Sequence, residues 1–370
     1  MTMSRRSILS GIAVSPLLLT NCGRAASESG HAAAPTPEPD WRGFHDFLRR
    51  QAADGRFSGA VAVAKGWKGG KPLLEEGYAM ADRRRREPNT ARTTFNIASM
   101  GKMFTAVAIA QLVQRGKLSF DDPMGEHVRG FPREIAGEVT LHHLLTHTAG
   151  MGDVLRRGPG HEPPRTIGAL MKLIAKEPLA FEPGSQMSYS NSGFIVLGAI
   201  VQQVSGQDYG DYLSKHVFKP ARMTATAIRA YRPADVPGMA HPYAESGEDL
   251  GREIRVATPA GGASSTVGDM IGFARALMAH RLLNRKLTET VITGKVQASG
   301  PGRGPDDKYA YGFGVRKVNG ARVIGHNGGS PGYEANLDIY PDLGYAVVIL
   351  ANQDRVIRPA SRKSEEIITA

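Results

Sequence analysis

The ends of this chain have strand-like patterns, and a long helical stretch separates them. Alternating or continuous apolar runs rich in β-branched residues predict strands, whereas apolar residues spaced three and four apart predict helices. Since both sets of strands can pair in one sheet, we predict an α+β fold with an antiparallel sheet formed from both chain termini, flanking helices and a helical lobe beside it. The expected strands are 59–64, 73–80, 93–97, 311–318, 322–326, 333–340 and 345–351; helices are expected at 40–53, 140–146, 167–176, 194–204, 269–283 and 361–368, within a mostly helical region 103–280.

Length and composition narrow the class of protein. With 370 residues, 41% of them hydrophobic and 22% charged, the chain can bury a large core. Its single cysteine, Cys22, excludes an intrachain disulfide and a cysteine metal cluster. The net charge is +11, but no aromatic interleaving or nucleic-acid motif accompanies it. We therefore expect no nucleic-acid partner.

The first 39 residues have the pattern of an export segment and a tether. Arg5-Arg6 precedes an apolar run from Ile8 to Leu19, which resembles a twin-arginine leader, and Asn21-Cys22 follows where a bacterial lipoprotein would be cleaved and lipidated. Lipoprotein signals usually have a small residue in place of Asn21. We expect an export signal at 1–22 with Cys22 as a candidate lipid anchor, a flexible linker at 23–39 and one domain at 40–370.

Arg83-Arg84-Arg85-Arg86 is the densest basic run of the chain. Such a run favours anionic surfaces. The simpler interpretation is a solvated loop between two strands, and we prefer it.

The first candidate catalytic residues lie in Ser99-Met100-Gly101-Lys102. This segment stands between a short expected strand and an almost wholly apolar expected helix that runs to Val113. Residues three apart share a helix face, so the Ser99 hydroxyl and the Lys102 amine can meet at the helix N-terminus. The alternative is a serine N-cap followed by a surface lysine. Burying a lysine amine in an apolar helix costs free energy when the amine has no function there, which favours the functional interpretation.

Two further segments add polar groups at the ends of elements. Tyr189-Ser190-Asn191 stands directly before the helix expected at 194–204, where a tyrosine can direct its phenol into a cleft; the alternative is an Asn191 helix cap with Tyr189 packed beneath it. His326-Asn327-Gly328-Gly329 ends a strand, and its glycines would let a ligand approach the backbone. A lone histidine such as His326 is more often structural.

Together these segments resemble the serine β-lactamase and penicillin-binding protein superfamily, and their order and spacing are similar to its class C branch. The resemblance covers about residues 40 to 352 and implies a β-lactamase/transpeptidase-like fold with the active site between the sheet and the helical lobe. The neighbouring segments that share it are Leu144-Leu145-Thr146-His147-Thr148-Ala149-Gly150, Phe181-Glu182-Pro183-Gly184, Pro259-Ala260-Gly261-Gly262-Ala263-Ser264-Ser265-Thr266 and Gly325-His326-Asn327-Gly328-Gly329 through Gly332-Tyr333.

The resemblance implies roles for individual residues. Ser99 would be the acylated nucleophile, and Lys102 and Tyr189 would share the proton transfers. Free lysine and free tyrosine both titrate near pH 10, so whichever is the resting base needs a shifted pKa, and the two arrangements stay open. Asn191 would bind the acyl side of the substrate and Lys102.

The strand of His326 would complete the site. Gly328 and Gly329 would lie against the substrate, and the oxyanion hole would consist of the N–H groups of Ser99 and Gly329. His326 stands where β-lactamases usually have lysine. Because histidine is largely neutral near pH 7, this departure disfavours a dedicated β-lactamase.

Two other sequence patterns could indicate a different nucleophile or a metal site. Gly328-Gly329-Ser330-Pro331-Gly332 matches the G-x-S-x-G nucleophile elbow, but Pro331 has no N–H to supply an oxyanion donor, and a strand rather than a helix is expected next. His142, His143 and His147 have spacing that could hold a metal, but no glutamate lies between the last two. We therefore expect no metal and no cofactor.

These observations predict an exported, periplasmic or envelope-anchored bacterial serine hydrolase that cleaves ester or amide bonds through an acyl-enzyme at Ser99. A carboxylesterase or D-stereospecific peptidase is favoured over a dedicated β-lactamase, so the partners are a small-molecule ester, amide or β-lactam and, as a further candidate, peptidoglycan. The alternative is a non-catalytic envelope protein that binds peptidoglycan or lipid through the same cleft.

Overall fold

The computed structural model describes residues 39–155, 164–300 and 304–370, all within the unit Pro39–Ala370. Arg5, Arg6 and Cys22, with the expected export signal and most of the expected linker, lie outside the described residues. Among the described helices, none has both the length and the apolar character needed to cross a lipid bilayer.

An eight-stranded sheet is the centre of the fold, with the order β2-β1-β12-β11-β10-β9-β8-β7. All of its neighbouring pairs are antiparallel, and β1 from the N-terminal part lies between β2 and the C-terminal β12. The predicted sheet from both chain termini is therefore confirmed. The strands are β1 (Gly59–Lys65), β2 (Leu74–Tyr78), β7 (Val296–Gln297), β8 (Lys308–Tyr309), β9 (Gly314–Val318), β10 (Ala321–Ser330), β11 (Tyr333–Tyr340) and β12 (Tyr345–Ala351).

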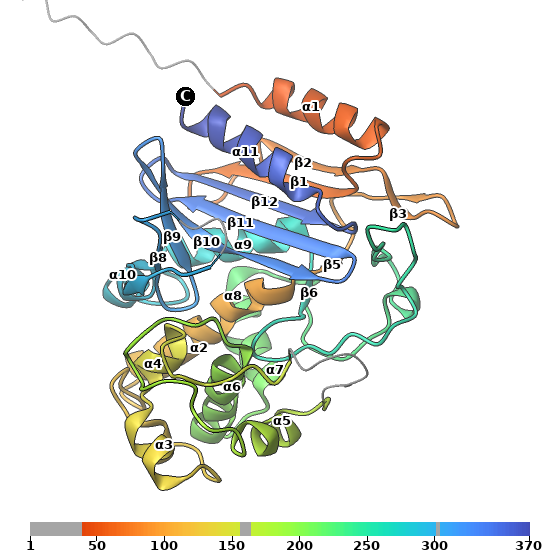
Figure 1. Cartoon of the computed structure of the whole chain (residues 1–370). Helices are drawn as coiled ribbons and strands as arrows, with labels where there is room; N and C mark the ends of the chain where they lie inside the picture. Colours follow the sequence, from red (N-terminus) through yellow and green to blue (C-terminus); the bar gives the residue numbers. More distant parts are fainter. Residues whose placement is uncertain (1–38, 156–163, 301–303) are drawn as a thin grey trace, which may run out of the picture. The chain divides into compact units, whose positions relative to one another are not determined.

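Helices cover both faces of the sheet (Figure 1). Alternate residues of β1 point to opposite faces, so Val61 and Val63 join one core cluster while Ala60 and Ala62 join the other. The valine face packs with α1 (Trp41–Ala53), which Asp40 caps, and α11 (Ile357–Ile368). The alanine face, whose small side chains allow close approach, contacts α9 (Val267–Met278).

A helical lobe lies beyond this second face (Figure 1). Its centre is the contact between α2 (Gly101–Gln114) and α6 (Asn191–Ser205), both buried along most of their length. Helices that are apolar on every side need such surroundings. The other elements of the lobe are η2 (Met124–Glu126), α3 (Arg133–Glu138), α4 (Leu141–Leu145), α5 (Ile167–Ile174), α7 (Tyr209–Leu213), η3 (Ser214–Phe218) and α8 (Lys219–Ala221); α10 (Arg285–Ile292) follows α9.

Two expectations for the backbone are wrong. Residues 222–263 are mostly loops that contain η4 (Pro233–Asp235), because isolated β-bridges rather than helical hydrogen bonds hold this segment. The strand expected at 73–80 is broken at Ala79, whose φ of +53° ends β2 before β3 (Met80–Asp82). The run Arg83–Arg86 forms the exposed turn between β3 and β4 (Glu87–Pro88), as expected.

Candidate active site

Ser99 lies in a short 3-10 turn, η1 (Ala98–Met100), between β5 (Phe95–Asn96) and α2. Ala98, directly before it, has a φ of +43°, a conformation that costs energy for an L-residue. The turn is fixed from both sides: Asn96 Oδ1 accepts a hydrogen bond from Ala98 N at 2.7 Å, and Gly262 N donates to Ala98 O at 3.1 Å. The serine hydroxyl is thus held at the start of α2 by the surrounding backbone, and no side-chain cap bond of Ser99 is involved.

Lys102 lies on the first turn of α2 and is fully buried. Its Nζ contacts three oxygens: Ser99 Oγ at 3.3 Å, Asn191 Oδ1 at 2.7 Å and the Ala260 carbonyl at 2.7 Å. The predicted meeting of the Ser99 and Lys102 side chains is confirmed, and the alternative of a surface lysine is wrong.

The N-terminus of α6 brings Tyr189 and Asn191 to Lys102. The Tyr189 ring centroid is 4.7 Å from Lys102 Nζ, within cation–π range. Ser190, not Asn191, caps α6 by accepting from Ser192 N at 3.2 Å, so the expected alternative of an Asn191 cap is wrong. Asn191 is instead oriented by its own amide, which donates to Asp153 Oδ2 at 2.9 Å and leaves Oδ1 facing the lysine.

The two glycines of β10 differ in what they contact. A Cβ on Gly328 would lie 2.5 Å from Ile97 O and 3.0 Å from Ser99 N, so only glycine lets the strand approach the turn that holds Ser99. Gly329 has open space at the same position and lines the cleft. Gly328 therefore packs against the Ser99 turn rather than facing the substrate space.

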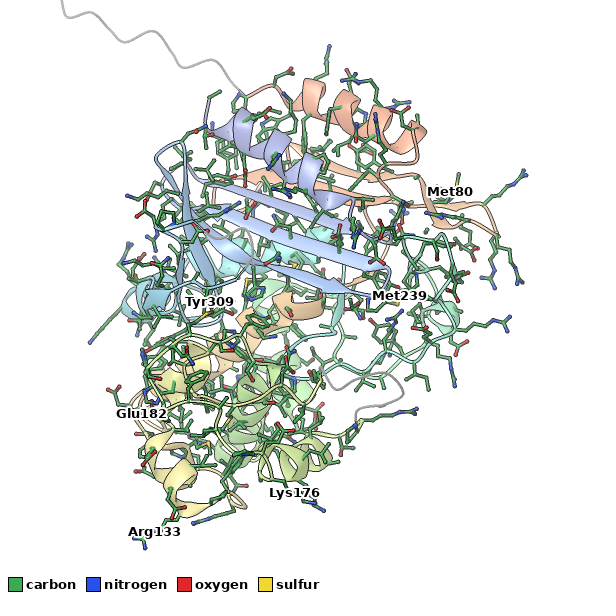
Figure 2. The ribbon with its side chains drawn as sticks, in the orientation of Figure 1. Met80, Arg133, Lys176, Glu182, Met239 and Tyr309 are labelled. Carbon is green, nitrogen blue, oxygen red and sulfur yellow. The ribbon has the colours of Figure 1, made fainter. Side chains whose placement is uncertain are left out.

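His326 belongs to an aromatic cluster at the border of sheet and lobe, where Tyr309 is labelled in Figure 2. Its Nδ1 donates to the Asn327 carbonyl, and its Nε2 bonds to the Tyr309 hydroxyl at 3.0 Å. Both ring nitrogens of His326 thus have protein partners, and the side chain is 8% exposed.

His147, which follows α4 with a φ of +61°, stacks on Tyr189 with ring centroids 4.2 Å apart. Its Nδ1 accepts from Ser190 N at 3.2 Å, which places the proton of the neutral ring on Nε2. Complete burial lowers the pKa of His147 well below its usual range, and a positive charge on Lys102 or His326 would lower it further. The ring is therefore neutral beneath Tyr189.

A cleft of about 420 Å³ opens above these groups. Ser99, Tyr189, Asn191 and Gly329 line it, while Lys102 lies beneath its floor. Among the described residues, Gly328 and His326 are not part of its wall. The other lining residues are Asn96, Ala98, Leu155, Arg255, Val256, Thr258, Ala260, Gly261, Gly262, Ser330 and Pro331.

The competing patterns are resolved by their surroundings. Ser330 ends β10, and the strand β11 follows it as expected, so this serine does not stand before a helix. The three histidines bond to different groups: His142 to the Tyr311 hydroxyl at 2.8 Å, His143 to Thr140 N at 3.3 Å, and His147 to Ser190 N.

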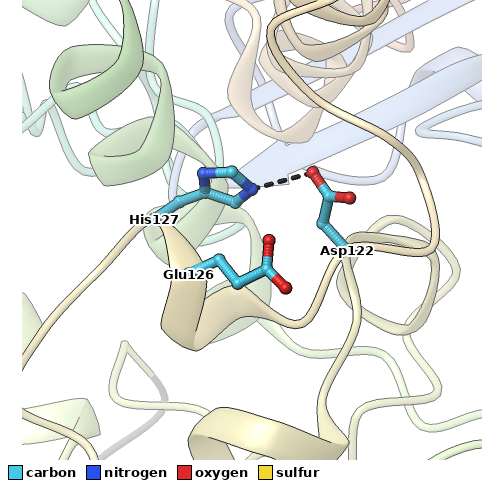
Figure 3. Close-up of side chains that lie close together, drawn as sticks. All are labelled: Asp122, Glu126 and His127. Atoms are coloured by element: carbon cyan, nitrogen blue, oxygen red, sulfur yellow. Dashed lines mark hydrogen bonds and ion pairs between the residues drawn. The ribbon is translucent and has the colours of Figure 1, made fainter.

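One other cluster brings together groups that bind metals. Asp122, Glu126 and His127 place three ligand atoms within 4.8 Å of one another (Figure 3). His127 Nε2 bonds to Asp122 Oδ2 at 2.9 Å, and that same oxygen accepts from Ser119 N at 2.8 Å. These bonds hold the loop between α2 and η2, which is a structural use of the two side chains.

Sequence reasoning did not identify Asp153, His147 or Arg255 as parts of this site. Asp153 and Arg255 lie in loops without a motif of their own, so only the folded contacts reveal them. His147 lies in one of the segments that share the family resemblance, but its stacking on Tyr189 had no signal in the sequence.

Comparison with known proteins agrees with this geometry. The Beta-lactamase family matches residues 44–369. Penicillin-binding protein 4* of Bacillus subtilis is 26% identical, over 81% of this chain and 69% of its own. Among solved structures, a penicillin-binding protein from Bacillus halodurans is 32% identical with a TM-score of 0.75, covering 86% of this chain and 98% of that one. A D-stereospecific amidohydrolase from Streptomyces sp. is 26% identical with a TM-score of 0.72, covering 89% and 98%. The chain therefore belongs to the beta-lactamase family and is a serine hydrolase with a penicillin-binding-protein-like fold.

Proposed function

We propose that the chain cleaves ester or amide bonds through an acyl-enzyme on Ser99. The observation that supports this most directly is the buried Lys102 amine 3.3 Å from Ser99 Oγ, at the edge of a cleft large enough for a small substrate. A serine hydroxyl is a weak nucleophile until a neighbouring base removes its proton. Lys102 and Tyr189 are the candidate bases.

The three contacts of Lys102 Nζ suggest how the proton moves. A neutral amine has two N–H groups, which Asn191 Oδ1 and the Ala260 carbonyl would accept, and its lone pair then faces Ser99 Oγ. As Oγ attacks the substrate carbonyl, its proton passes to Lys102 Nζ, and it is later delivered to the leaving group. Tyr189, whose ring lies over the same amine, would share this transfer. Attack by water on the acyl-serine then regenerates the free hydroxyl.

The developing oxyanion needs donors on the opposite side. Ser99 N and Gly329 N are the proposed pair, because the strand of Gly329 approaches the Ser99 turn through Gly328. Each such donor typically contributes about 3 to 4 kcal/mol to transition-state stabilisation.

The proposed substrates are esters and amides, including D-amino-acid amides or peptides, rather than β-lactams alone. The amidohydrolase named above is similar in both sequence and fold. His326, whose ring nitrogens both have protein partners, supplies no fixed cation for a β-lactam carboxylate. A protein that only binds its ligand would not need Lys102 beside Ser99, which disfavours the non-catalytic alternative.

Export to the bacterial envelope is a further part of the proposal. It rests on Arg5-Arg6, the apolar run behind them and Cys22 as a candidate lipid anchor. Radiolabelled palmitate should enter the natural chain but not Cys22→Ser; equal labelling of both would contradict the anchor.

Chemical labelling tests the catalytic proposal. Purified protein should react with a fluorophosphonate and gain its mass on the peptide that contains Ser99. Ser99→Ala should lose both this labelling and the hydrolysis of p-nitrophenyl esters, with an unchanged circular dichroism spectrum. Ester hydrolysis at the original rate in Ser99→Ala would refute the assignment. A fluorescent penicillin tested in parallel reports whether β-lactams acylate the same serine.

A further inference from the structure

Asp153 and Lys102 bond to opposite ends of the Asn191 side-chain amide. We propose that Asp153 is a positioning residue for the reaction: its carboxylate fixes the orientation of this amide and so keeps the lone pair of Lys102 directed at Ser99. This inference rests on the proposed function and extends it to a residue outside the motifs that indicated the site.

The loop that carries Asp153 is fixed to the start of α6 by side chains of that helix. The bonded pairs are Gly152 with Ser190, Asp153 with Asn191, and Val154 with Ser192. The two serine bonds, at 2.7 and 3.1 Å, flank the bond from Asn191 Nδ2 to Asp153 Oδ2 at 2.9 Å. Both serines are buried, so water does not compete for these bonds. The carboxylate is therefore held in register with Asn191.

A carboxylate in this position determines how the Asn191 amide is oriented. Carboxylate oxygens only accept hydrogen bonds, so the amide must present its NH2 group to Asp153. The other oxygen, Asp153 Oδ1, accepts from Leu155 N at 3.1 Å, which restrains the carboxylate from a second direction. Asn191 Oδ1 then faces Lys102 Nζ at 2.7 Å. In the reversed orientation two acceptors would face each other, and the hydrogen bond to Asp153 would be lost.

The orientation of Asn191 decides where the lone pair of a neutral Lys102 points. With Oδ1 facing Nζ, the amine donates its two N–H groups to Asn191 and the Ala260 carbonyl, and its lone pair is left for Ser99 Oγ at 3.3 Å. A reversed amide would present an N–H group to Nζ, and the lone pair would accept that bond. Lys102 could then not take the proton of Ser99. Asp153 thus excludes an inactive arrangement of the base.

The negative charge of Asp153 acts on Lys102 through the same bonds. A carboxylate that accepts from Asn191 Nδ2 polarises the amide and makes Oδ1 a stronger acceptor for the lysine N–H groups. Both this polarisation and the charge itself favour the protonated amine. Removing the carboxylate should therefore lower the pKa of Lys102 and yet slow the reaction, a combination that a loss of packing alone does not produce. Such a variant keeps the other titratable groups of this cluster, which are Tyr189, His147 and His326.

Asp153→Asn tests the proposal, because it keeps the size of the side chain but lets Asn191 adopt either orientation. The second-order rate constant for fluorophosphonate labelling of Ser99 reports acylation alone. We expect it to fall by about 10- to 100-fold, part of the 100- to 10,000-fold that positioned proton transfer contributes. In its pH profile, the limb set by Lys102 should move to lower pH by about 0.5 to 1 unit. Asp40→Asn, the same substitution at an exposed helix cap on the far side of the sheet, should change neither.

A double-mutant cycle separates positioning from a structural role. Asn191→Ala removes the group through which Asp153 acts, so in that background Asp153→Asn should lower the labelling rate by less than about 2-fold. Equal losses in both backgrounds, or an unchanged rate in Asp153→Asn alone, would overturn this inference. An Asp153→Asn chain that is unfolded at room temperature would overturn it as well, because the carboxylate would then be structural. Failure of the natural protein to react with a fluorophosphonate at Ser99 would instead refute the proposed function.

Discussion

Replacing Lys102 by methionine separates the catalytic from the structural contribution of this buried lysine. Methionine has a similar length and no charge, so it should fill the space that the fully buried lysine leaves. The proton acceptor beside Ser99 Oγ is lost, and positioned proton transfer typically contributes 100- to 10,000-fold to a rate. We therefore expect kcat/KM for p-nitrophenyl acetate to fall by about that factor.

The same change should affect stability far less. Asn191 Oδ1 and the Ala260 carbonyl lose their donor, which costs about 1 to 3 kcal/mol each if nothing replaces it. Both residues line the cleft, so water can enter and take the place of the amine as donor. These effects offset one another, and we expect a net change in the free energy of unfolding of about 2 kcal/mol or less.

The assay compares ester hydrolysis and thermal unfolding in Lys102→Met and in Lys172→Met, a control that removes an exposed lysine of α5. The control should match the natural protein in both measurements. If Lys102→Met keeps more than about a tenth of kcat/KM, Lys102 does not transfer the proton. If it fails to fold, the lysine is structural and the balance argued above is wrong.

Three further changes give distinct results. Gly328→Ala should lower both the melting temperature and activity, because its Cβ would lie 2.5 Å from a backbone oxygen, whereas Gly329→Ala, in open space, should unfold at the original temperature; equal melting temperatures would refute the packing argument. His147→Asn places asparagine, which tolerates a positive φ, at this position. The variant should be less stable than the natural protein at pH 7.5. Urea unfolding should show that the difference between their free energies of unfolding is about 2 kcal/mol smaller at pH 5. Below pH 6.5 this histidine binds a proton in the unfolded chain but stays neutral in the folded protein, so the natural protein loses stability as the pH falls. A difference in unfolding free energy that is the same at both pH values would contradict the lowered pKa. Lysines in place of Arg5 and Arg6 should block export of the folded protein, and normal appearance in a periplasmic fraction would indicate the general secretory route.

Much of the fold follows from local patterns in the sequence. The predicted strands 333–340 and 345–351 coincide with β11 and β12, because the alternation of apolar and polar residues in the first and the continuous apolar run in the second are both typical of strands. The loops at 222–263 were misjudged, because their backbone hydrogen bonds run to residues far away in the sequence, such as Thr94 and Asn352. Nonlocal pairing of this kind has no periodic signal.

The residues of the site are also of two kinds: some contacts follow from the local sequence, and others depend on segments that only the folded chain brings together. The spacing of Ser99 and Lys102 is a property of one helix turn, so the sequence could predict their contact. The partners that complete the site come from other segments: Ala260 and Arg255 from the loops at 222–263, and Asp153 from a loop beyond α4.

Close backbone packing is what brings these separate segments to Ser99. Gly261 and Gly328 approach the Ser99 turn from two sides, and a Cβ on either would lie 3.0 Å or less from the backbone of that turn. The strained φ of Ala98 is maintained by the same contacts, since Gly262 bonds to its carbonyl. The rigid wall formed in this way places Arg255 and Ser330 in the wall of the same cleft as the nucleophile. Substrate selection can therefore change through the loop of Arg255 while the packing around Ser99 stays fixed.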